Sequence, residues 1–488
     1  MRWPTVERMM IDRAVAEYFN QWQAPSAHVE LATRPIAHWI ADQAIVAGAP
    51  IKVYEPSTEG IYTETYEAGS QLVDRAVSAA RAAFEGEWGA MKPLDRQGLI
   101  FKLADLLVKY QEELGFLESV DVGKPREMAN MIDIGQAIDV LRYFAGWATK
   151  ISGRTGAMVS YDSTFYGMTI KKPVGVVAAI APWNFPFQTL IWKVAAAFAA
   201  GCTVVAKPSE VTPVTALRLA ELIQEAGFPA GVFNVVNGTG AITGAALVSH
   251  PGIDKVSFTG STASGKIVGQ AAIGNMTRLT LELGGKSPAL VFADSDIDRV
   301  VEGLFNGIFF NSGQVCDASS RAIVDRRIAD EVLGKLVERA AAVRLGPGLD
   351  PSSTMGPLVS DLHRSKVVSF VERARNSKLR FSIDRSSETN RGHFVGPVII
   401  EEVPLQHPVW REEIFGPVLA FNTADGPDEI IRLARDTNYG LGASIYSGDI
   451  GRVFAAAAKI DAGTIYVNGH GFLDPAFPFG GQHLRHRH

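Results

Sequence analysis

Residues 173–208 read PVGVVAAIAPWNFPFQTLIWKVAAAFAAGCTVVAKP, and in this stretch two β-rich runs flank a long helical pattern. The alternation continues with GVFNVVNG at 231–238 and KVSFTG at 255–260, each followed by a helical pattern. Strands that alternate with helices of this length form βαβ units, in which the strands are parallel. The region from about 170 to 275 therefore predicts a parallel sheet covered by helices.

One helix of this region, in TPVTALRLAELIQEAGF at 212–228, carries clear boundary residues. Thr212 suits the N-cap, Pro213 the first helical position and Gly227 the end. A second region of similar character runs from about 287 to 470 and begins SPALVFADSDIDRVVEGLF. The sequence thus predicts a second α/β unit after the first.

Length and charge limit the classes of partner. The chain has 488 residues, a net charge of −5 and two cysteines, so two or three domains fit and no basic footprint for nucleic acid or anionic membrane is present. The N-terminus lacks an apolar signal core, and the apolar run at 194–206 is too short and glycine-broken to span a bilayer. We expect a soluble cytoplasmic protein, with which the low cysteine content agrees.

A glycine-rich turn follows the strand KVSFTG. Gly260, Gly265 and Lys266 spell GxxxxGK, but Ile267 replaces the hydroxyl residue that a P-loop uses for magnesium, which disfavours an NTPase. The turn fits a dinucleotide-binding site better than a P-loop. Gly260 lets the backbone approach a phosphate, Ser261 can donate to it, and the helix N-terminus is positive.

A second strand end, VVAKPSE, places Lys207 and Glu210 where ligands gather in open parallel sheets. A carboxylate there accepts hydrogen bonds from ribose hydroxyls and repels the extra phosphate of NADP. A solvated loop is the alternative for this pair alone. Together the two strand ends favour NAD.

The stretch FFNSGQVCDASSR at 309–321 contains Cys316, which no structural need explains. A free thiol has a pKa of about 8.5, so a catalytic cysteine needs surroundings that favour the thiolate. Glu282 in LTLELGGKSP can serve as a general base, and the amide of Asn184 in IAPWNFPFQ can donate to an oxyanion. A buried small cysteine, a satisfied carboxylate and an asparagine turn are the alternatives for the three residues taken singly.

The chain resembles the NAD(P)-dependent aldehyde dehydrogenase superfamily over roughly residues 51–481. The segments that carry the resemblance are PWNFP (182–186), KPSE (207–210), FTGST (258–262), LELGGKSP (281–288), NSGQVCDASSR (311–321), EEIFGPV (412–418) and PFGG (478–481).

The resemblance implies a catalytic scheme. Cys316 is the nucleophile, Glu282 is the general base, and the Asn184 amide with the Cys316 backbone N–H forms the oxyanion hole. An aldehyde is oxidised through a thiohemiacetal and a thioester to the carboxylic acid, with NAD as hydride acceptor. Glu282 favours hydrolysis over transfer of the acyl group to coenzyme A, and Cys202 in AAGCTVV is expected in the core.

The resemblance also implies which residues contact NAD. These are Ile180, Pro182, Trp183, Lys207, Ser209, Glu210, Gly240, Gly244, Phe258, Gly260, Ser261, Leu283, Glu413 and Phe415.

The implied fold is α/β, with two Rossmann-type parallel-sheet domains and a small bridging hairpin used in oligomerisation. We expect an atypical segment at 1–50, an NAD-binding domain at 51–150 and 172–284, the hairpin at 151–171, a catalytic domain at 285–481 and a tail at 482–488.

The substrate expectation rests on GVFNVVNGTGAITGAALVSHP and VNGHGFLDPAFPFGG, which are most similar to phenylacetaldehyde dehydrogenases. An arylalkyl aldehyde is therefore expected. Asp317 departs from the family's usual small or apolar residue, and either favours a cationic aldehyde, such as betaine aldehyde or an aminoaldehyde, or faces solvent. The residues implied in the entry funnel are Phe185, Gln188, Thr189, Trp192, Val315, Asp317, Leu473 and Phe479.

The C-terminus also departs from the family, which continues after PFGG with a loop and a strand that joins the hairpin and a neighbouring subunit. The given sequence ends with QHLRHRH instead. We therefore expect a weakened homo-oligomer, and a truncated, inactive NAD-binding homologue is the second hypothesis. The histidines of the tail are not expected to form a metal site.

Overall fold

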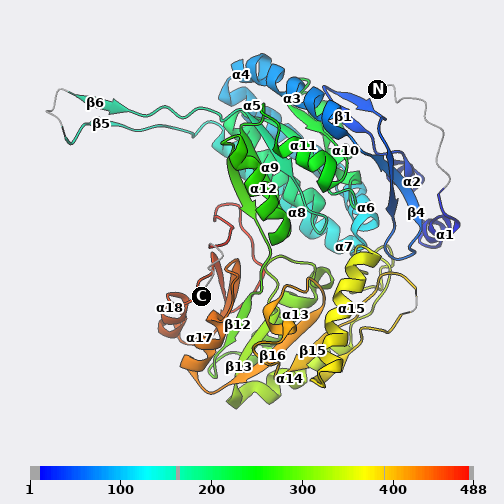
Figure 1. Ribbon diagram of the computed structural model, residues 1–488, viewed down its shortest axis with the longest axis vertical. Helices are drawn as coiled ribbons and strands as arrows, with labels where there is room; N and C mark the ends of the chain where they lie inside the picture. Colours follow the sequence, from blue (N-terminus) through cyan, green and yellow to red (C-terminus); the bar gives the residue numbers. More distant parts are fainter. Residues whose placement is uncertain (1–10, 161–164, 390, 483–488) are drawn as a thin grey trace.

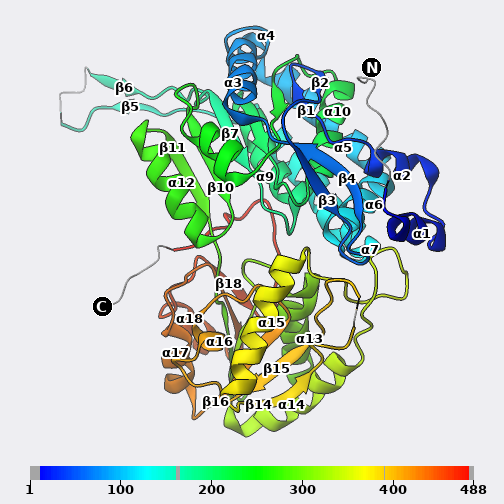
Figure 2. The same cartoon turned by 45° about the vertical axis from the view of Figure 1, so that its right-hand side comes forward.

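The computed structural model describes residues 11–160, 165–389 and 391–482, which form two α/β bodies (Figures 1 and 2). The first body, the upper one in Figure 1, contains most of the N-terminal half. The second body, the lower one, contains the chain after about residue 285. The expected α/β fold with two parallel-sheet units is confirmed.

The first sheet has the strand order β11-β10-β7-β8-β9-β1-β2. Its first five strands are parallel, whereas β1 runs antiparallel to β9 and pairs with β2 as a hairpin. Every residue of β7 and β8 is buried, as expected for apolar strands with helices on both faces. The bounds are β1 (His38–Ile40), β2 (Gln43–Ile45), β7 (Val176–Ile180), β8 (Thr203–Lys207), β9 (Phe233–Val235), β10 (Lys255–Thr259) and β11 (Arg278–Glu282).

Helices cover both faces of this sheet. One face packs against α9 (Pro186–Ala200) and α10 (Val214–Ala226), and α5 (Pro93–Lys109), α6 (Gln111–Val122) and α8 (Gly135–Trp147) pack on these two helices and share the same core. The other face packs against α3 (Gly69–Glu85), α11 (Ala245–Val248) and α12 (Thr262–Gly274). Short helical turns connect them: α4 (Glu87–Ala90), α7 (Arg126–Met128), η1 (Ala129–Ile134) and η2 (Gly240–Gly244).

Residues 11–49, to which the sequence analysis assigns no role, belong to the first body. It supplies β1 and β2 to the sheet, and α1 (Arg13–Gln21) and α2 (Ser26–Thr33) pack on the same core. The hairpin of β3 (Pro50–Tyr54) and β4 (Ile61–Tyr66) follows.

The start of α10 corrects the expected cap. The helix begins at Val214, and the backbone N–H of Val214 donates to Asp121 Oδ2 at 3.0 Å. Thr212 is fully buried, and its hydroxyl has no hydrogen-bond partner among the described residues. The carboxylate at the end of α6 therefore replaces the local hydroxyl. Gly227 ends the helix at φ 90°, as predicted.

The second sheet has the strand order β14-β15-β16-β13-β12-β17-β18 and is parallel except for β14. Its strands are β12 (Pro288–Val291), β13 (Arg321–Asp325), β14 (Arg380–Asp384), β15 (Val398–Glu401), β16 (Val418–Ala424), β17 (Gly442–Tyr446) and β18 (Thr464–Val467). Around it lie α13 (Ile297–Phe309), η3 (Phe310–Gly313), α14 (Arg326–Ala341), α15 (Asp361–Asn376), α16 (Pro408–Arg411), α17 (Pro427–Arg435) and α18 (Ile450–Ala457).

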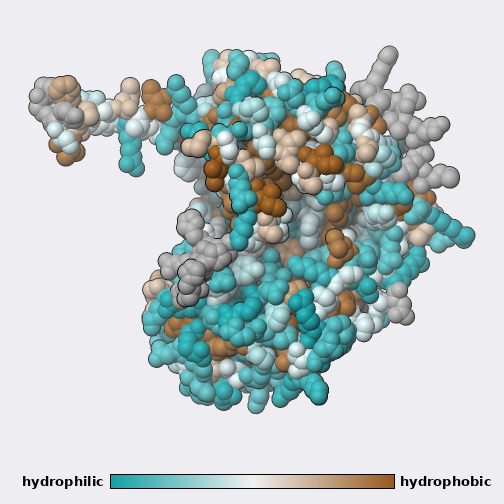
Figure 3. All heavy atoms as spheres, viewed as in Figure 1, coloured by the Kyte–Doolittle hydropathy of each residue, from teal (hydrophilic) through white to brown (hydrophobic). Residues whose placement is uncertain are grey.

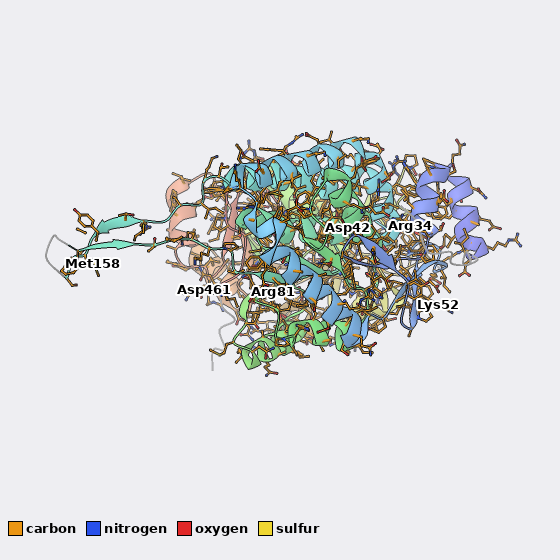
Figure 4. All side chains as sticks on the ribbon, turned by 90° about the horizontal axis from the view of Figure 1, so that it is seen from above. Arg34, Asp42, Lys52, Arg81, Met158 and Asp461 are labelled. Atoms are coloured by element: carbon orange, nitrogen blue, oxygen red, sulfur yellow. The ribbon has the colours of Figure 1, made fainter. Side chains whose placement is uncertain are left out.

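An antiparallel hairpin of β5 (Thr155–Ala157) and β6 (Tyr166–Met168) projects from the upper body like an arm (Figure 1). Seen from above, it extends beyond the rest of the chain, with Met158 near its end (Figure 4). Apolar side chains are exposed along it (Figure 3). Residues 161–164 of the expected hairpin and 483–488 of the expected tail lie outside the described residues.

In the described ranges of the chain, no helix has the length and apolar content required to cross a membrane.

Candidate active site

The carboxyl ends of neighbouring strands in the first sheet meet along one edge. Ile180 at the end of β7 pairs with Lys207 and Phe258, and Thr259 pairs with Glu282. This register gathers four of the segments singled out in the sequence at the side of the sheet that faces the second body. Ligands bind at this edge in open parallel sheets.

Cavities of about 240 Å³ and about 420 Å³ adjoin at this edge. Cys316 from the second body and Glu282 from the first line both of them. Asn184 lines the smaller one. Tertiary structure thus brings the expected nucleophile, base and oxyanion donor together from three distant segments.

A left-handed turn positions the loop at residues 311–316, called the nucleophile loop because it ends at the expected nucleophile Cys316. Asn311, Ser312 and Gly313 have φ values of 46°, 56° and 73°. A Cβ on Gly313 would lie 2.2 Å from the backbone of Gly416, so only glycine lets the NSGQVC loop approach the EEIFGPV segment this closely. The Ser312 hydroxyl donates to the carbonyl of Gly356 at 2.7 Å and holds the turn.

The surroundings of Cys316 favour the thiol over the thiolate. Burial is the largest cause that raises the pKa of Cys316 well above its ordinary value, and the carboxylates of Asp317, Glu413 and Glu282 raise it further. A thiolate therefore needs added positive charge or loss of one of these negative charges before it forms near neutral pH.

Asn184 is nearly buried, and its amide nitrogen donates to the Gln314 carbonyl at 2.8 Å. An amide carries two N–H groups, so one remains for a ligand in the cavity that Asn184 lines. The Asn184 backbone carbonyl accepts from Asn311 Nδ2 at 3.1 Å. The PWNFP segment is thereby attached directly to the nucleophile loop.

Glu282 ends the edge strand β11. Burial raises the pKa of its carboxyl, and the ammonium of Lys193 partly opposes that rise. Its Oε2 is buried without a hydrogen-bond partner among the described residues. A carboxylate with a raised pKa and a free oxygen beside Cys316 fits the task of a general base.

The smaller cavity is lined by several of the residues that the sequence analysis expects to contact NAD. Besides the residues above, it contains Pro182, Trp183, Gly260, Ser261, Leu283, Glu413 and Phe415 from the sequence analysis. It lies at the N-terminus of α12, where the Ser261 hydroxyl accepts from Ser264 N at 3.1 Å. A Cβ on Gly265 would lie 2.4 Å from Leu283, so glycine allows α12 to lie close against the Glu282 segment.

The remaining expected cofactor residues lie outside this cavity. Ile180 and Phe258 are buried at the ends of their strands, and Lys207 donates to the Pro208 carbonyl at 2.8 Å. Its ammonium is 3.6 Å from the Glu210 carboxylate. Ser209 accepts from Val211 N, Gly244 lies against the Lys207 side chain, and Gly240 is exposed.

Residues that the sequence reasoning missed also line the site. His363 Nε2 lies 2.7 Å from the Phe415 carbonyl, and its ring packs against Trp183. Burial lowers the pKa of His363 to about 4, so the ring is neutral near pH 7, and with Nε2 donating to the carbonyl its Nδ1 can accept a hydrogen bond. The Lys193 ammonium donates to Thr259 Oγ1 at 2.7 Å. Lys193 was visible in the sequence as a charged residue inside the apolar helix 186–200, whereas no local pattern marked His363.

The expected funnel residues divide into two groups. Phe185 and Thr189 line the smaller cavity, and Thr189, Trp192 and Phe479 line the larger one. The rings of Trp192 and Phe479 meet edge to face, with centroids 5.8 Å apart. Among the described residues that line these two cavities, Gln188, Val315 and Leu473 do not appear; the Gln188 amide is hydrogen-bonded to Gln136.

Asp317 corrects both sequence interpretations. It is only 4 % exposed and does not face solvent, and neither cavity's described lining includes it. Its Oδ2 accepts from the hydroxyl of Tyr466 at 2.7 Å. The ring of Tyr466 packs on His470. The carboxylate is thus paired with a buried hydroxyl on β18.

Comparisons with known proteins agree with this site. The model of the Aldehyde dehydrogenase family matches residues 39–484. The chain is 41% identical over 436 residues to the putative aldehyde dehydrogenase DhaS of Bacillus subtilis, covering 89% of this chain and 88% of that protein. It is 42% identical over 439 residues to human aldehyde dehydrogenase 1A1, with 89% and 87% covered.

A solved NAD+ complex of an aldehyde dehydrogenase from Bacillus cereus superposes with a TM-score of 0.90 at 38% identity, covering 98% of this chain and 94% of that one. Coverage of this extent does not support the expectation of a truncated homologue. With the nucleophile, base and amide at one sheet edge and a family model matched over most of its length, the chain belongs to the aldehyde dehydrogenase family.

Proposed function

We propose that this protein is an NAD-dependent aldehyde dehydrogenase that oxidises an arylalkyl aldehyde to its carboxylic acid, with Cys316 as the nucleophile. The observation that carries the proposal is the junction of the cavities, where Cys316 and Glu282 line both and Asn184 lines the smaller.

The residues at the smaller cavity fit NAD. Trp183, Leu283 and Phe415 offer flat or apolar surfaces to a nicotinamide ring, and Glu413 offers a carboxylate to ribose hydroxyls. Gly260 and the N-terminus of α12 suit the diphosphate. NAD, when bound there, supplies the acceptor for the hydride. Glu210 at the end of β8 disfavours the extra phosphate of NADP, so we expect higher catalytic efficiency with NAD.

We assign the following chemistry to the protein's own groups from the family resemblance and from where these groups lie in the two cavities. The Cys316 thiolate adds to the aldehyde carbonyl, and the free N–H of Asn184 with the Cys316 backbone N–H stabilises the oxyanion that forms. After loss of hydride, the acyl group is a thioester on Cys316. Glu282 takes a proton from water, which attacks the thioester and releases the acid.

The arylalkyl substrate is supported by the larger cavity. Its apolar lining includes the indole of Trp192 and the ring of Phe479, against which an aromatic substrate can pack by its face or edge. The alternative of a cationic aldehyde loses its main support, because the Asp317 carboxylate is occupied by Tyr466.

Rapid mixing of enzyme, NAD and phenylacetaldehyde tests the mechanism through the absorbance of NADH. Cys316→Ala should give no NADH while still binding NAD. Glu282→Gln should give a full, rapid burst of NADH followed by slow turnover, because the base acts after hydride transfer. Turnover in the cysteine variant, or a burst slowed as much as turnover in the glutamine variant, would contradict the assigned roles.

A panel of aryl, aliphatic and cationic aldehydes tests the substrate class. We expect the highest kcat/KM for arylalkyl aldehydes, and Trp192→Ala should lower that value more for phenylacetaldehyde than for a short aliphatic aldehyde. Preference for betaine aldehyde would refute the class.

Two further proposals concern the context of the enzyme. The negative net charge and the low cysteine content support a cytoplasmic location, and fractionation would test it. The exposed apolar arm supports a homo-oligomer, whose test is given below.

A further inference from the structure

Lys124 is a buried cation close to the active site that the proposed mechanism does not use. It follows α6 directly after Gly123, which ends that helix in the left-handed region at φ 89°. Its side chain has no exposed surface. Burying an ammonium is costly unless charged or polar groups surround it, so the identity of its partners indicates what it does.

Three acceptors surround the ammonium. It donates to Asp133 Oδ1 at 2.6 Å and to the backbone carbonyl of Asn184 at 3.0 Å, and it lies 4.1 Å from the centre of the Phe185 ring. An ammonium has three N–H groups, so the Asp133 carboxylate, the Asn184 carbonyl and the Phe185 ring account for all three. Two of the three partners belong to the PWNFP segment.

Two carboxyl groups, those of Glu118 and Asp133, lie near the Lys124 ammonium. Burial and the neighbouring Asp133 raise the pKa of Glu118 well above its ordinary value. Glu118 Oε1 lies 4.0 Å from the ammonium, farther away than Asp133 Oδ1 at 2.6 Å. Asp133 is thus the counter-ion that fixes Lys124, and Lys124 in turn fixes the carbonyl of Asn184.

The same carbonyl accepts from Asn311, whose amide also donates to the Gln314 carbonyl at 3.3 Å. That Gln314 carbonyl is the acceptor for the Asn184 side chain. The backbone carbonyl of Asn184 is thus hydrogen-bonded to Lys124 and to Asn311, and its side-chain amide is hydrogen-bonded to the same loop through Gln314.

We propose that Lys124 is a positioning residue that orients the Asn184 amide toward the oxyanion formed on Cys316. The inference rests on the proposed function, since it presumes that Asn184 donates to the oxyanion. It predicts that removal of Lys124 acts only through Asn184.

A double-mutant cycle separates this role from a general loss of stability. Lys124→Met alone leaves the Asp133 carboxylate buried without its cation, so the variant used is Lys124→Met/Asp133→Asn, which removes both charges. Asn184→Ala removes the oxyanion donor, a change that in other enzymes slows the chemical step about 10²–10³-fold. All variants are made in the full chain, and binding of NAD is measured for each.

We expect the paired variant to slow the NADH burst about tenfold or more with NAD affinity unchanged. In the Asn184→Ala background the same pair should slow the burst less than about twofold, because residues that act as a unit are not additive. The matched control is Lys286→Met, which removes another buried lysine amine, one without a hydrogen-bond partner among the described residues. Its effect should be the same in both backgrounds.

The outcomes are distinguishable. Full additivity of the paired variant with Asn184→Ala would overturn the positioning role of Lys124 while leaving the proposed function intact. An Asn184→Ala enzyme with an unchanged burst would instead refute the oxyanion role in the proposed function. If the paired variant binds no NAD, Asp133→Asn alone, which keeps the lysine but releases its counter-ion, should give a smaller effect that is likewise lost with Asn184→Ala. Additivity there would overturn the inference.

Discussion

Asp317 shows how one side chain beside the nucleophile affects its chemistry. The carboxylate is buried, follows Cys316 directly in the chain and accepts from Tyr466. Placed there, it opposes the formation of a second negative charge on the thiol. The carboxylate therefore acts on the pKa of Cys316, although it is not among the described residues that line the two cavities.

Asp317→Asn should lower the pKa of Cys316, because a cause that raises this pKa is removed while burial and the other carboxylates remain. The rate of alkylation by iodoacetamide, measured against pH without cofactor, reports the thiolate. Its rise should move to lower pH in the variant. Asp294→Asn, at a carboxylate that is not among the causes acting on Cys316, serves as the control and should leave the profile in place. An unshifted profile for Asp317→Asn would contradict the assignment.

Lys193 acts on Glu282 in the opposite direction. Burial raises the pKa of Glu282 and the Lys193 ammonium lowers it, so Lys193→Met should raise the pKa of the base further. Deacylation needs the ionised base, and its rate falls as the pH drops through that pKa. The acid limb of the kcat profile should therefore move to higher pH, whereas the limb would stay in place if the two groups did not interact.

At the scale of single elements, α10 depends on a cap supplied by another helix. Asp121 on α6 accepts from Val214 N at the first turn, whereas the adjacent Thr212 hydroxyl is buried without a partner among the described residues. A carboxylate that accepts a backbone N–H at a helix start stabilises the helix through the hydrogen bond and the helix dipole. The cap also ties α6, which precedes Lys124, to the Rossmann-type sheet.

Asp121→Ala should lower the stability by about 1–2 kcal/mol, the usual contribution of an N-cap, and more if the hydroxyl of Tyr62 is left unpaired. Thr212→Val should be neutral or stabilising, since it removes a buried hydroxyl without a partner and keeps the shape of the side chain. Thermal unfolding of both variants measures this. A larger loss for Thr212→Val than for Asp121→Ala would restore the cap first predicted from the sequence.

Asp121 also gives this region a defined pH dependence. Burial raises its pKa to about 7 in the folded protein, from an ordinary value of 3.8. Because the folded state binds the proton more tightly than the unfolded state, the contribution of this group to stability falls as the pH rises from about 4 to about 7. The decline should be weaker in Asp121→Asn, as judged from melting temperatures across that range.

At the scale of the whole molecule, the arm formed by β5 and β6 is the feature that the isolated chain does not explain. Val159, Tyr166, Met168 and Ile170 are more than two-thirds exposed there, and both strands are only three residues long. Short hairpins are marginally stable in water without packing. Exposed apolar side chains on such an arm fit contact with a second copy of the chain.

Replacing Tyr166, Met168 and Ile170 with serine should therefore lower the oligomeric order, measured by light scattering coupled to size exclusion. The residues that line the two cavities lie outside the arm strands β5 and β6, so NAD binding should persist and serves as the control. A monomer from the unchanged chain, or an unchanged oligomer from the triple variant, would refute the role of the arm.

Local patterns in the sequence were enough to predict the alternation of strands and helices and to single out the residues with catalytic chemistry. Periodicity and the backbone preferences of glycine and proline act over a few residues, so β7, β8, β10 and the end of α10 at Gly227 were predictable. Cys316, Glu282 and Asn184 stand in segments whose local text matches the aldehyde dehydrogenase family.

The contacts between groups far apart in the sequence became visible only in the folded chain. Asp317 meets Tyr466 149 residues away, Asp121 caps a helix that starts 93 residues later, and Lys124 holds a carbonyl 60 residues away. The strands at 38–45 likewise join a sheet whose other strands begin at residue 176. A buried polar group must find a partner wherever the packing provides one, and local sequence does not specify that partner because the contact is made only when the sheets and helices have packed.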